Sequence, residues 1–136
     1  MRGFTFRLDR VLRIRRAEKQ QKQLALARLY GELHGVEEQK ETIIRKLHEN
    51  KGAQDRLLAE RYRNKLEKEF ALLEKREDEL CAKAAMQMVE LDQATAKVKT
   101  LERLREKRLA RYTKKQRRKE EAESALHASQ KRPMFT

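Results

Sequence analysis

The sequence predicts an all-α fold: a long antiparallel two-helix coiled-coil hairpin with helices of unequal length. Charged residues make up 42% of the 136 residues and aromatic residues 5%, too little apolar material for a thick globular core. The chain is rich in Ala, Glu, Lys, Leu and Arg, which favours long helices where apolar residues are periodic. Two periodic stretches flank one turn signal. We therefore expect one coiled-coil domain over residues 1–136.

The first helix is expected over about residues 6–50. Its seam alternates spacings of three and four, which is the heptad pattern of a coiled coil, and contains one polar member. The seam runs through Leu26, Leu29, Leu33, Val36, Lys40, Ile43 and Leu47. It extends back through three basic residues, whose alkyl stems can cover apolar surface, to Leu12 and Leu8.

The second helix is expected over about residues 55–128, followed by a flexible tail at 129–136. Its seam keeps the same alternation through Leu66, Phe70, Leu73, Glu77, Leu80, Ala84, Gln87, Leu91, Ala94, Val98 and Leu101. It continues through Arg105 and Arg108 to Tyr112. Since this helix is much longer than the first, its C-terminal part has no partner within the hairpin.

Asn50 and Gly52 mark the turn, which we place at residues 51–54. Folding the chain back at about residue 53 brings six apolar pairs into register. The expected pairs are Leu47 with Leu58, Ile43 with Tyr62, Val36 with Phe70, Leu33 with Leu73, Leu26 with Leu80, and Leu8 with Val98. These twelve residues form the predicted hairpin seam.

The net charge of +13 is concentrated at both ends of the sequence. Residues 1–28 and residues 101–136 each carry a net charge of +7, whereas residues 29–60 carry −2 and residues 61–100 carry +1. A hairpin brings the two ends together, so the sequence predicts a basic pole. Such a pole attracts an acidic surface or a polyanion.

No pattern typical of an enzyme is present, and we expect no catalytic, metal or cofactor site. There is no glycine-rich phosphate loop and no nucleophile elbow, and the three histidines are scattered. Cys81, the only cysteine, is interpreted as a small residue beside the seam. The sequence shows neither a signal peptide nor a membrane span, so a soluble, cytoplasmic protein is expected.

Nucleic-acid binding is one alternative. Residues 114–119 form a dense basic run, and four arginines lie within residues 10–16, ahead of leucine heptads as in a basic leucine zipper. Residues 10–16 lack the asparagine expected of a base-reading helix. We therefore expect no specific nucleic-acid partner, only binding that is lost as salt rises.

Two motifs resemble the FliJ family of flagellar type III export proteins. The first is Phe4-x-Phe6-x-Leu8-x-x-Val11-Leu12-x-Ile14-Arg15, which is similar to the opening of that family. The second is the stretch over residues 98–108, VKTLERLREKR, followed by Tyr112. Residues 120–125, EEAESA, stand where many relatives carry an Asp-Glu pair, which is a departure from the family pattern.

The resemblance implies a non-enzymatic stalk protein of the export apparatus. Such a protein enters the export ATPase hexamer through its terminal coiled-coil end and promotes its assembly and activity. It also contacts the export gate FlhA and escorts export chaperones, at the cytoplasmic face of the inner membrane. The equivalent stalk of a virulence-type secretion system is the alternative, and the Phe4-x-Phe6-x-Leu8 opening favours the flagellar one.

The resemblance also implies two sets of site residues. The expected ATPase-binding residues of the basic pole are Arg10, Arg13, Arg16, Arg103, Arg105 and Arg108. The expected gate contact lies on the second helix, at a stretch that begins with a phenylalanine, and its candidate residues are Phe70, Leu73 and Leu80. These last three also belong to the predicted hairpin seam.

Overall fold

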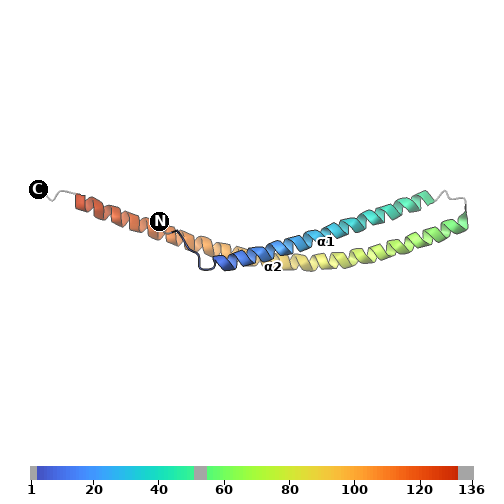
Figure 1. The fold of residues 1–136 in the computed structure, drawn as a ribbon, viewed down its shortest axis with the longest axis horizontal. Coiled ribbons are helices and arrows are strands. Elements are labelled where there is room, and N and C mark those ends of the chain that lie inside the picture. Colours follow the sequence, from blue (N-terminus) through green and yellow to red (C-terminus); the bar gives the residue numbers. More distant parts are fainter. Residues whose placement is uncertain (1–2, 51–54, 132–136) are drawn as a thin grey trace. The chain divides into compact units, whose positions relative to one another are not determined.

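The computed structural model describes residues 3–50 and 55–131, and this part of the chain holds two helices and no strand. Helix α1 spans Asp9–Glu49 and helix α2 spans Arg56–Lys131. The helices are packed antiparallel as a hairpin with arms of unequal length (Figure 1). The predicted fold class is therefore confirmed. The predicted turn at 51–54 lies outside the described residues.

Local hydrogen bonds set where each helix begins. In α1 the amide of Leu12 donates to the carbonyl of Leu8 at 2.8 Å, so helical bonding begins beside Asp9 rather than at residue 6. In α2, Asp55 is the N-cap: one carboxylate oxygen accepts from the amides of Leu57 at 3.0 Å and Leu58 at 3.3 Å. Both starts satisfy amides that have no partner within the helix.

Helix α2 ends later than predicted. It continues to Lys131, so the expected flexible tail is wrong for residues 129–131, and residues 132–136 lie outside the described part. The physical reason is the composition of residues 120–131. They contain Ala, Glu, Leu, Gln and Lys, which are good helix formers, and neither Gly nor Pro occurs between residue 120 and Pro133.

The chain divides into two compact units. Unit 1 comprises Met1–Ala17 with Thr95–Thr136, and unit 2 comprises Glu18–Ala94. In each unit a stretch of α1 packs against a stretch of α2. The residues buried in the described part all lie on the predicted seams except Phe6, which precedes α1: Phe6, Leu12, Leu26, Val36, Ile43, Leu66, Leu80, Ala84, Ala94 and Val98.

The predicted register between the helices is wrong. Leu58 and Tyr62 are 62% and 42% exposed, so they do not pair with Leu47 and Ile43. Ion pairs show the register that forms instead: Arg105 Nε lies 3.3 Å from an Asp9 carboxylate oxygen, and Lys40 Nζ lies 3.1 Å from Glu77.

All six expected apolar pairs are thus displaced, by about seven residues or one heptad. A shift of one heptad leaves the same residues on the seam, so apolar spacing cannot distinguish the two registers. The charges do distinguish them. A slip of one heptad, about 10 Å along the helix, to the predicted register would break four of the five ion pairs that join α1 to α2. These four are Asp9–Arg105, Arg16–Glu102, Lys22–Glu90 and Lys40–Glu77, whereas the fifth, Glu32–Arg76, is compatible with either register.

Candidate interaction surfaces

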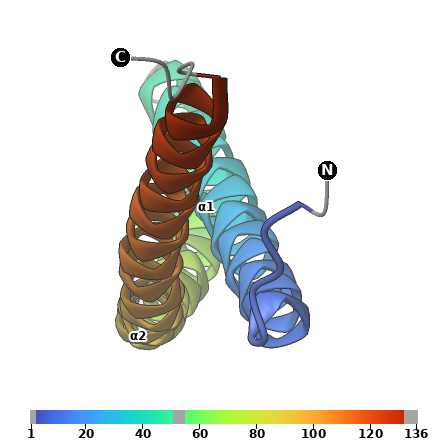
Figure 2. The ribbon, with the colours of Figure 1, turned by 90° about the vertical axis from the view of Figure 1, so that its left-hand side faces the viewer.

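The residues before α1 form an arm that packs on α2 within unit 1. We call residues 3–8 the N-terminal arm; it turns at the start of α1 (Figures 1 and 2), and its ring contacts place it against α2. Phe6 is only 4% exposed, and the guanidinium of Arg108 lies 5.6 Å from its ring centre. The ring of Phe4 lies 5.6 Å from that of Tyr112. The arm therefore extends the seam beyond the N-terminal end of α1.

This packing joins the two motifs that the sequence analysis singled out. Phe4 and Phe6 come from the first motif, and their partners Arg105, Arg108 and Tyr112 come from the second. Arg105 serves twice, because it lies 5.8 Å from the Phe4 ring centre and forms the ion pair with Asp9. Sequence spacing alone gives no indication of these contacts, since residues 4 and 6 lie outside any helix.

The six candidate arginines all fall in unit 1, and they divide into two groups. Three of them make contacts within the unit. Arg16 pairs with Glu102, Arg105 pairs with Asp9 and lies over the Phe4 ring, and Arg108 lies over the Phe6 ring. Arg10, Arg13 and Arg103 are exposed and form no ion pair within the described part of the chain. Only this second group has its charge fully available to a partner.

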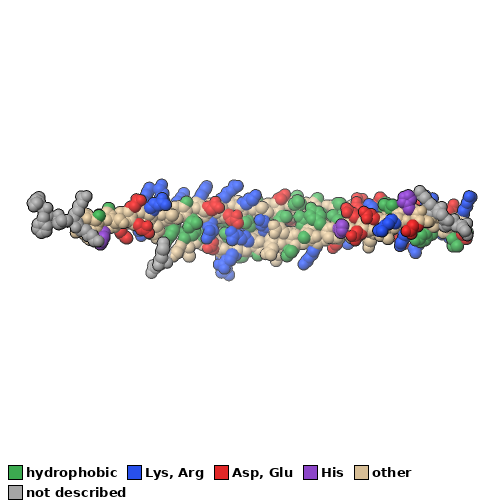
Figure 3. All heavy atoms as spheres, turned by 90° about the horizontal axis from the view of Figure 1, so that it is seen from above, with side chains coloured by type: hydrophobic (Ala, Val, Ile, Leu, Met, Phe, Trp, Pro, Cys, Tyr) green, Lys and Arg blue, Asp and Glu red, His purple; other side chains and the backbone are tan. Residues whose placement is uncertain are grey.

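The net charge of the protein resides in unit 1. Residues 1–17 and 95–136 contain twenty basic and six acidic side chains, which gives +14, whereas residues 18–94 contain fifteen and sixteen, which gives −1. Figure 3 shows Lys and Arg side chains gathered on its left-hand part, where Figure 1 places the C-terminal half of α2. The predicted basic pole therefore corresponds to one structural unit.

The three gate candidates differ in accessibility. Leu80 is 1% exposed and belongs to the core, so the expectation that it contacts a partner is wrong for this folded state. Phe70 is half-buried beneath Lys40, whose Nζ lies 5.1 Å from the ring centre. Leu73 is half-buried and lines a groove between the two helices. Only Phe70 and Leu73 keep some surface.

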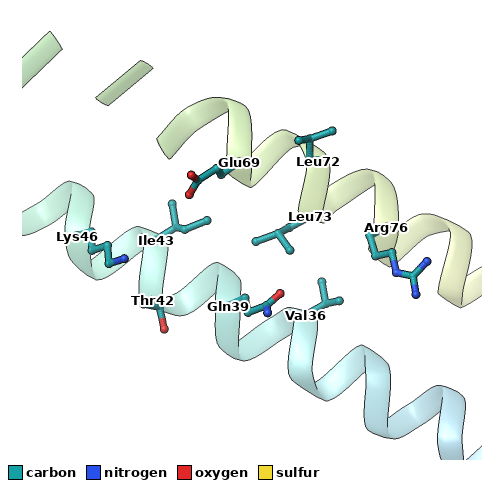
Figure 4. A pocket seen from close by; sticks show the side chains of 9 residues that line it. All are labelled: Val36, Gln39, Thr42, Ile43, Lys46, Glu69, Leu72, Leu73 and Arg76. Atoms are coloured by element: carbon teal, nitrogen blue, oxygen red, sulfur yellow. The ribbon is translucent and has the colours of Figure 1, made fainter. Parts of the chain in front are cut away.

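The groove in unit 2 has a volume of about 610 Å³. Leu73 points from α2 toward Val36 and Ile43 of α1, whereas Leu72 stands on the outer side of α2 (Figure 4). Leu72 is 68% exposed, and the sequence analysis missed it because it lies off the seam. Leu72 could have been found from the sequence, because it is a leucine at a position of the heptad that should face solvent.

Within residues 3–50 and 55–131, no helix is long and apolar enough to cross a membrane. No group of three or more His, Cys, Asp or Glu side chains in that part is arranged to hold a metal ion.

Comparison of the chain with protein-family models, with curated proteins and with solved structures gave no match. The geometry therefore defines a class, a helical hairpin with one strongly basic unit, and the assignment of a role rests on the motifs and on the two units.

Proposed function

We propose that this chain is a non-enzymatic stalk protein of the flagellar type III export apparatus, similar to the FliJ family. In this role unit 1 enters the central opening of the export ATPase hexamer and promotes its assembly and activity. The chain acts in the cytoplasm, peripherally at the inner membrane, and links the ATPase to the export gate FlhA and to export chaperones.

One observation carries the proposal: both resemblance motifs meet in unit 1, which also carries the net positive charge. The arm with Phe4 and Phe6 packs on the stretch that contains Arg105, Arg108 and Tyr112. A hexamer opening that receives a stalk needs a narrow, well-ordered end, and this aromatic packing supplies one. The exposed charges of Arg10, Arg13 and Arg103 then supply attraction toward acidic side chains.

The gate contact is proposed at unit 2, on the outer side of the groove. Leu72 is exposed, Leu73 lines the groove, and both follow Phe70 on α2. An exposed leucine beside a groove of this volume, which a half-buried leucine lines, fits an apolar side chain of a partner. Leu80 is buried in the core and is not part of this proposed contact.

The test is the hydrolysis rate of the cognate flagellar export ATPase with and without this protein, near physiological salt. We expect stimulation, and we expect the variant Arg10→Glu/Arg13→Glu/Arg103→Glu to need a concentration about tenfold higher for half of the effect, since each exposed contact contributes modestly. These three arginines are chosen because Arg16, Arg105 and Arg108 also stabilise the unit.

The matched control is Arg61→Glu/Lys65→Glu/Lys68→Glu, which changes the net charge equally but on exposed positions of unit 2. It should stimulate like the unaltered chain. Equal loss in both variants would show that only overall charge matters. Absence of stimulation and of co-elution with the ATPase would refute the proposal.

A further inference from the structure

One face of α2 in unit 1 carries an uninterrupted row of cations. It consists of Arg103, Lys107, Arg111, Lys114 and Arg118, which we call the basic stripe. At 100° per residue these five positions fall within about 80° of one another, and they extend over about 22 Å of helix. All five side chains are exposed, and none forms an ion pair within the described part of the chain.

The stripe faces away from the hairpin. The seam residues of the same stretch, Val98, Leu101, Arg105 and Tyr112, lie about 120° to 180° around the helix from the centre of the stripe. The arm and α1 pack on the seam side, through Phe4, Phe6 and Asp9. The stripe therefore takes no part in the contacts that join the arm and α1 to α2.

A shallow hollow of about 560 Å³ runs along α2 beside the stripe. It is lined by Glu106, Leu109, Ala110, Thr113, Lys114 and Arg117. Leu109, Ala110 and Thr113 give the hollow an apolar strip, and the small side chains of Ala110 and Thr113 allow close approach of another backbone. Leu109 is 36% exposed there. Charge on one side and a small apolar strip on the other form the pattern that an amphipathic helix matches.

We propose that the basic stripe binds an acidic amphipathic α-helix of another protein, which lies along α2 with its carboxylates on the stripe and its apolar residues over the hollow. Both helices rise 1.5 Å per residue, so carboxylates at matching positions stay opposite the cations over the whole stripe. This inference does not depend on the proposed function, because it concerns a face defined by α2 alone.

Two other polyanions fit less well. The phosphates of a duplex follow a curved path, so a straight stripe meets them only where it crosses a strand. The stripe also contains no aromatic residue on which a base could stack. A membrane-bound helix needs large apolar residues beside its charges, and only Leu109 lines the hollow in that way.

The probe is a synthetic helical peptide of about three heptads, held helical by a lactam bridge, with Glu at stripe-facing positions and Leu or Ala beside them. Its binding to the full chain is measured by fluorescence anisotropy near physiological salt. A peptide of the same composition in scrambled order and a short DNA duplex are the competitors. We expect the ordered peptide to bind at least about tenfold more tightly than the scrambled one.

The stripe variant is Lys107→Glu/Arg111→Glu/Lys114→Glu, and the control is Lys97→Glu/Lys115→Glu/Lys119→Glu, which places the same charge change on exposed positions of α2 off the stripe. The first should weaken peptide binding about tenfold and the second much less. A neutral variant, Lys107→Gln/Arg111→Gln/Lys114→Gln, should also weaken binding. It controls for the possibility that the three Glu substitutions of the stripe variant reduce the helix content of α2.

Equal weakening by the stripe and control variants would overturn the proposal, since it would show attraction to overall charge only. Equal binding of ordered and scrambled peptides would overturn it too. Tighter, stripe-dependent binding of the duplex would assign the stripe to nucleic acid instead. No export ATPase is present in this experiment, so failure here leaves the stalk proposal to its own test.

Discussion

At the scale of single residues, the seam contains polar side chains whose surroundings differ. Lys40 has both a carboxylate and an aromatic ring within reach. Gln87 lies on the seam of α2, also in unit 2, but its side-chain carbonyl oxygen is buried without a hydrogen-bond partner within the described residues. A buried acceptor without a partner costs free energy because it has given up its bond to water.

Replacing Gln87 by Met should therefore stabilise the protein by about 1 kcal/mol, since Met fills the same space and removes the unpaired oxygen. The free energy of unfolding is measured by urea denaturation followed by helical circular dichroism. Gln93→Met, at an exposed position of the same helix, is the control and should change little. Destabilisation by Gln87→Met would mean that the amide has a partner in solution.

At the scale of the helices, apolar periodicity predicted most of the seam. Leu12, Leu26, Ile43, Leu66 and Val98 are buried as predicted, whereas Leu58 and Tyr62 of the predicted hairpin seam are exposed. The register was not predictable from that pattern, because a slip of one heptad presents the same seam. The information lay in the charges, above all in the polar seam residues Lys40 and Glu77, which face each other.

The contacts of the N-terminal arm were not predictable for a different reason. Phe4 and Phe6 precede α1, so no helical period assigns them to a face. Their burial depends on α2 continuing past the start of α1, which is a property of the pair and not of either segment. The fold class and most of the seam could thus be predicted, whereas the register and the packing of the N-terminal arm in unit 1 required the structure.

A charge swap tests whether Lys40 and Glu77 select the register. Both are less than a third exposed, at 20% and 30% for their side chains. Lys40→Glu and Glu77→Lys should each destabilise the protein, and the double swap should recover about 1 kcal/mol of the summed loss. The measurement is a double-mutant cycle of the free energy of unfolding.

The pair Lys22 and Glu90 is the control for that cycle, because its side chains are 40% and 45% exposed and solvent screens the charges more. Its coupling should be smaller. If Lys40 and Glu77 show no coupling, the register is set by other contacts, and the explanation given for the displaced apolar pairs fails.

At the scale of the whole molecule, the two proposed contacts fall in different units. The proposed ATPase contact involves the exposed arginines of unit 1, whose net charge is +14, and the proposed gate contact involves Leu72 of unit 2, whose net charge is −1. Electrostatic attraction governs the first and apolar burial the second, so the two should respond to different substitutions and to salt in different ways.

The two contacts should therefore be separable. Leu72→Asp should abolish binding to the cytoplasmic domain of the export gate, measured by co-sedimentation, and leave ATPase stimulation unchanged. Arg10→Glu/Arg13→Glu/Arg103→Glu should do the reverse. Leu24→Asp, which alters an exposed leucine of α1 in the same unit, is the control for Leu72 and should keep gate binding. Loss of both activities in either variant would contradict a division by unit.

The packing of the N-terminal arm also has a consequence for how the protein is made. Phe4 and Phe6 leave the ribosome early, but Arg108 and Tyr112, on which they pack, are added about a hundred residues later. At typical elongation rates this interval lasts on the order of 5 to 20 seconds. By the end of that interval every residue of unit 2 has been added to the chain, whereas two phenylalanines of unit 1 are still uncovered, and we expect them to be a point of contact for a chaperone of nascent chains.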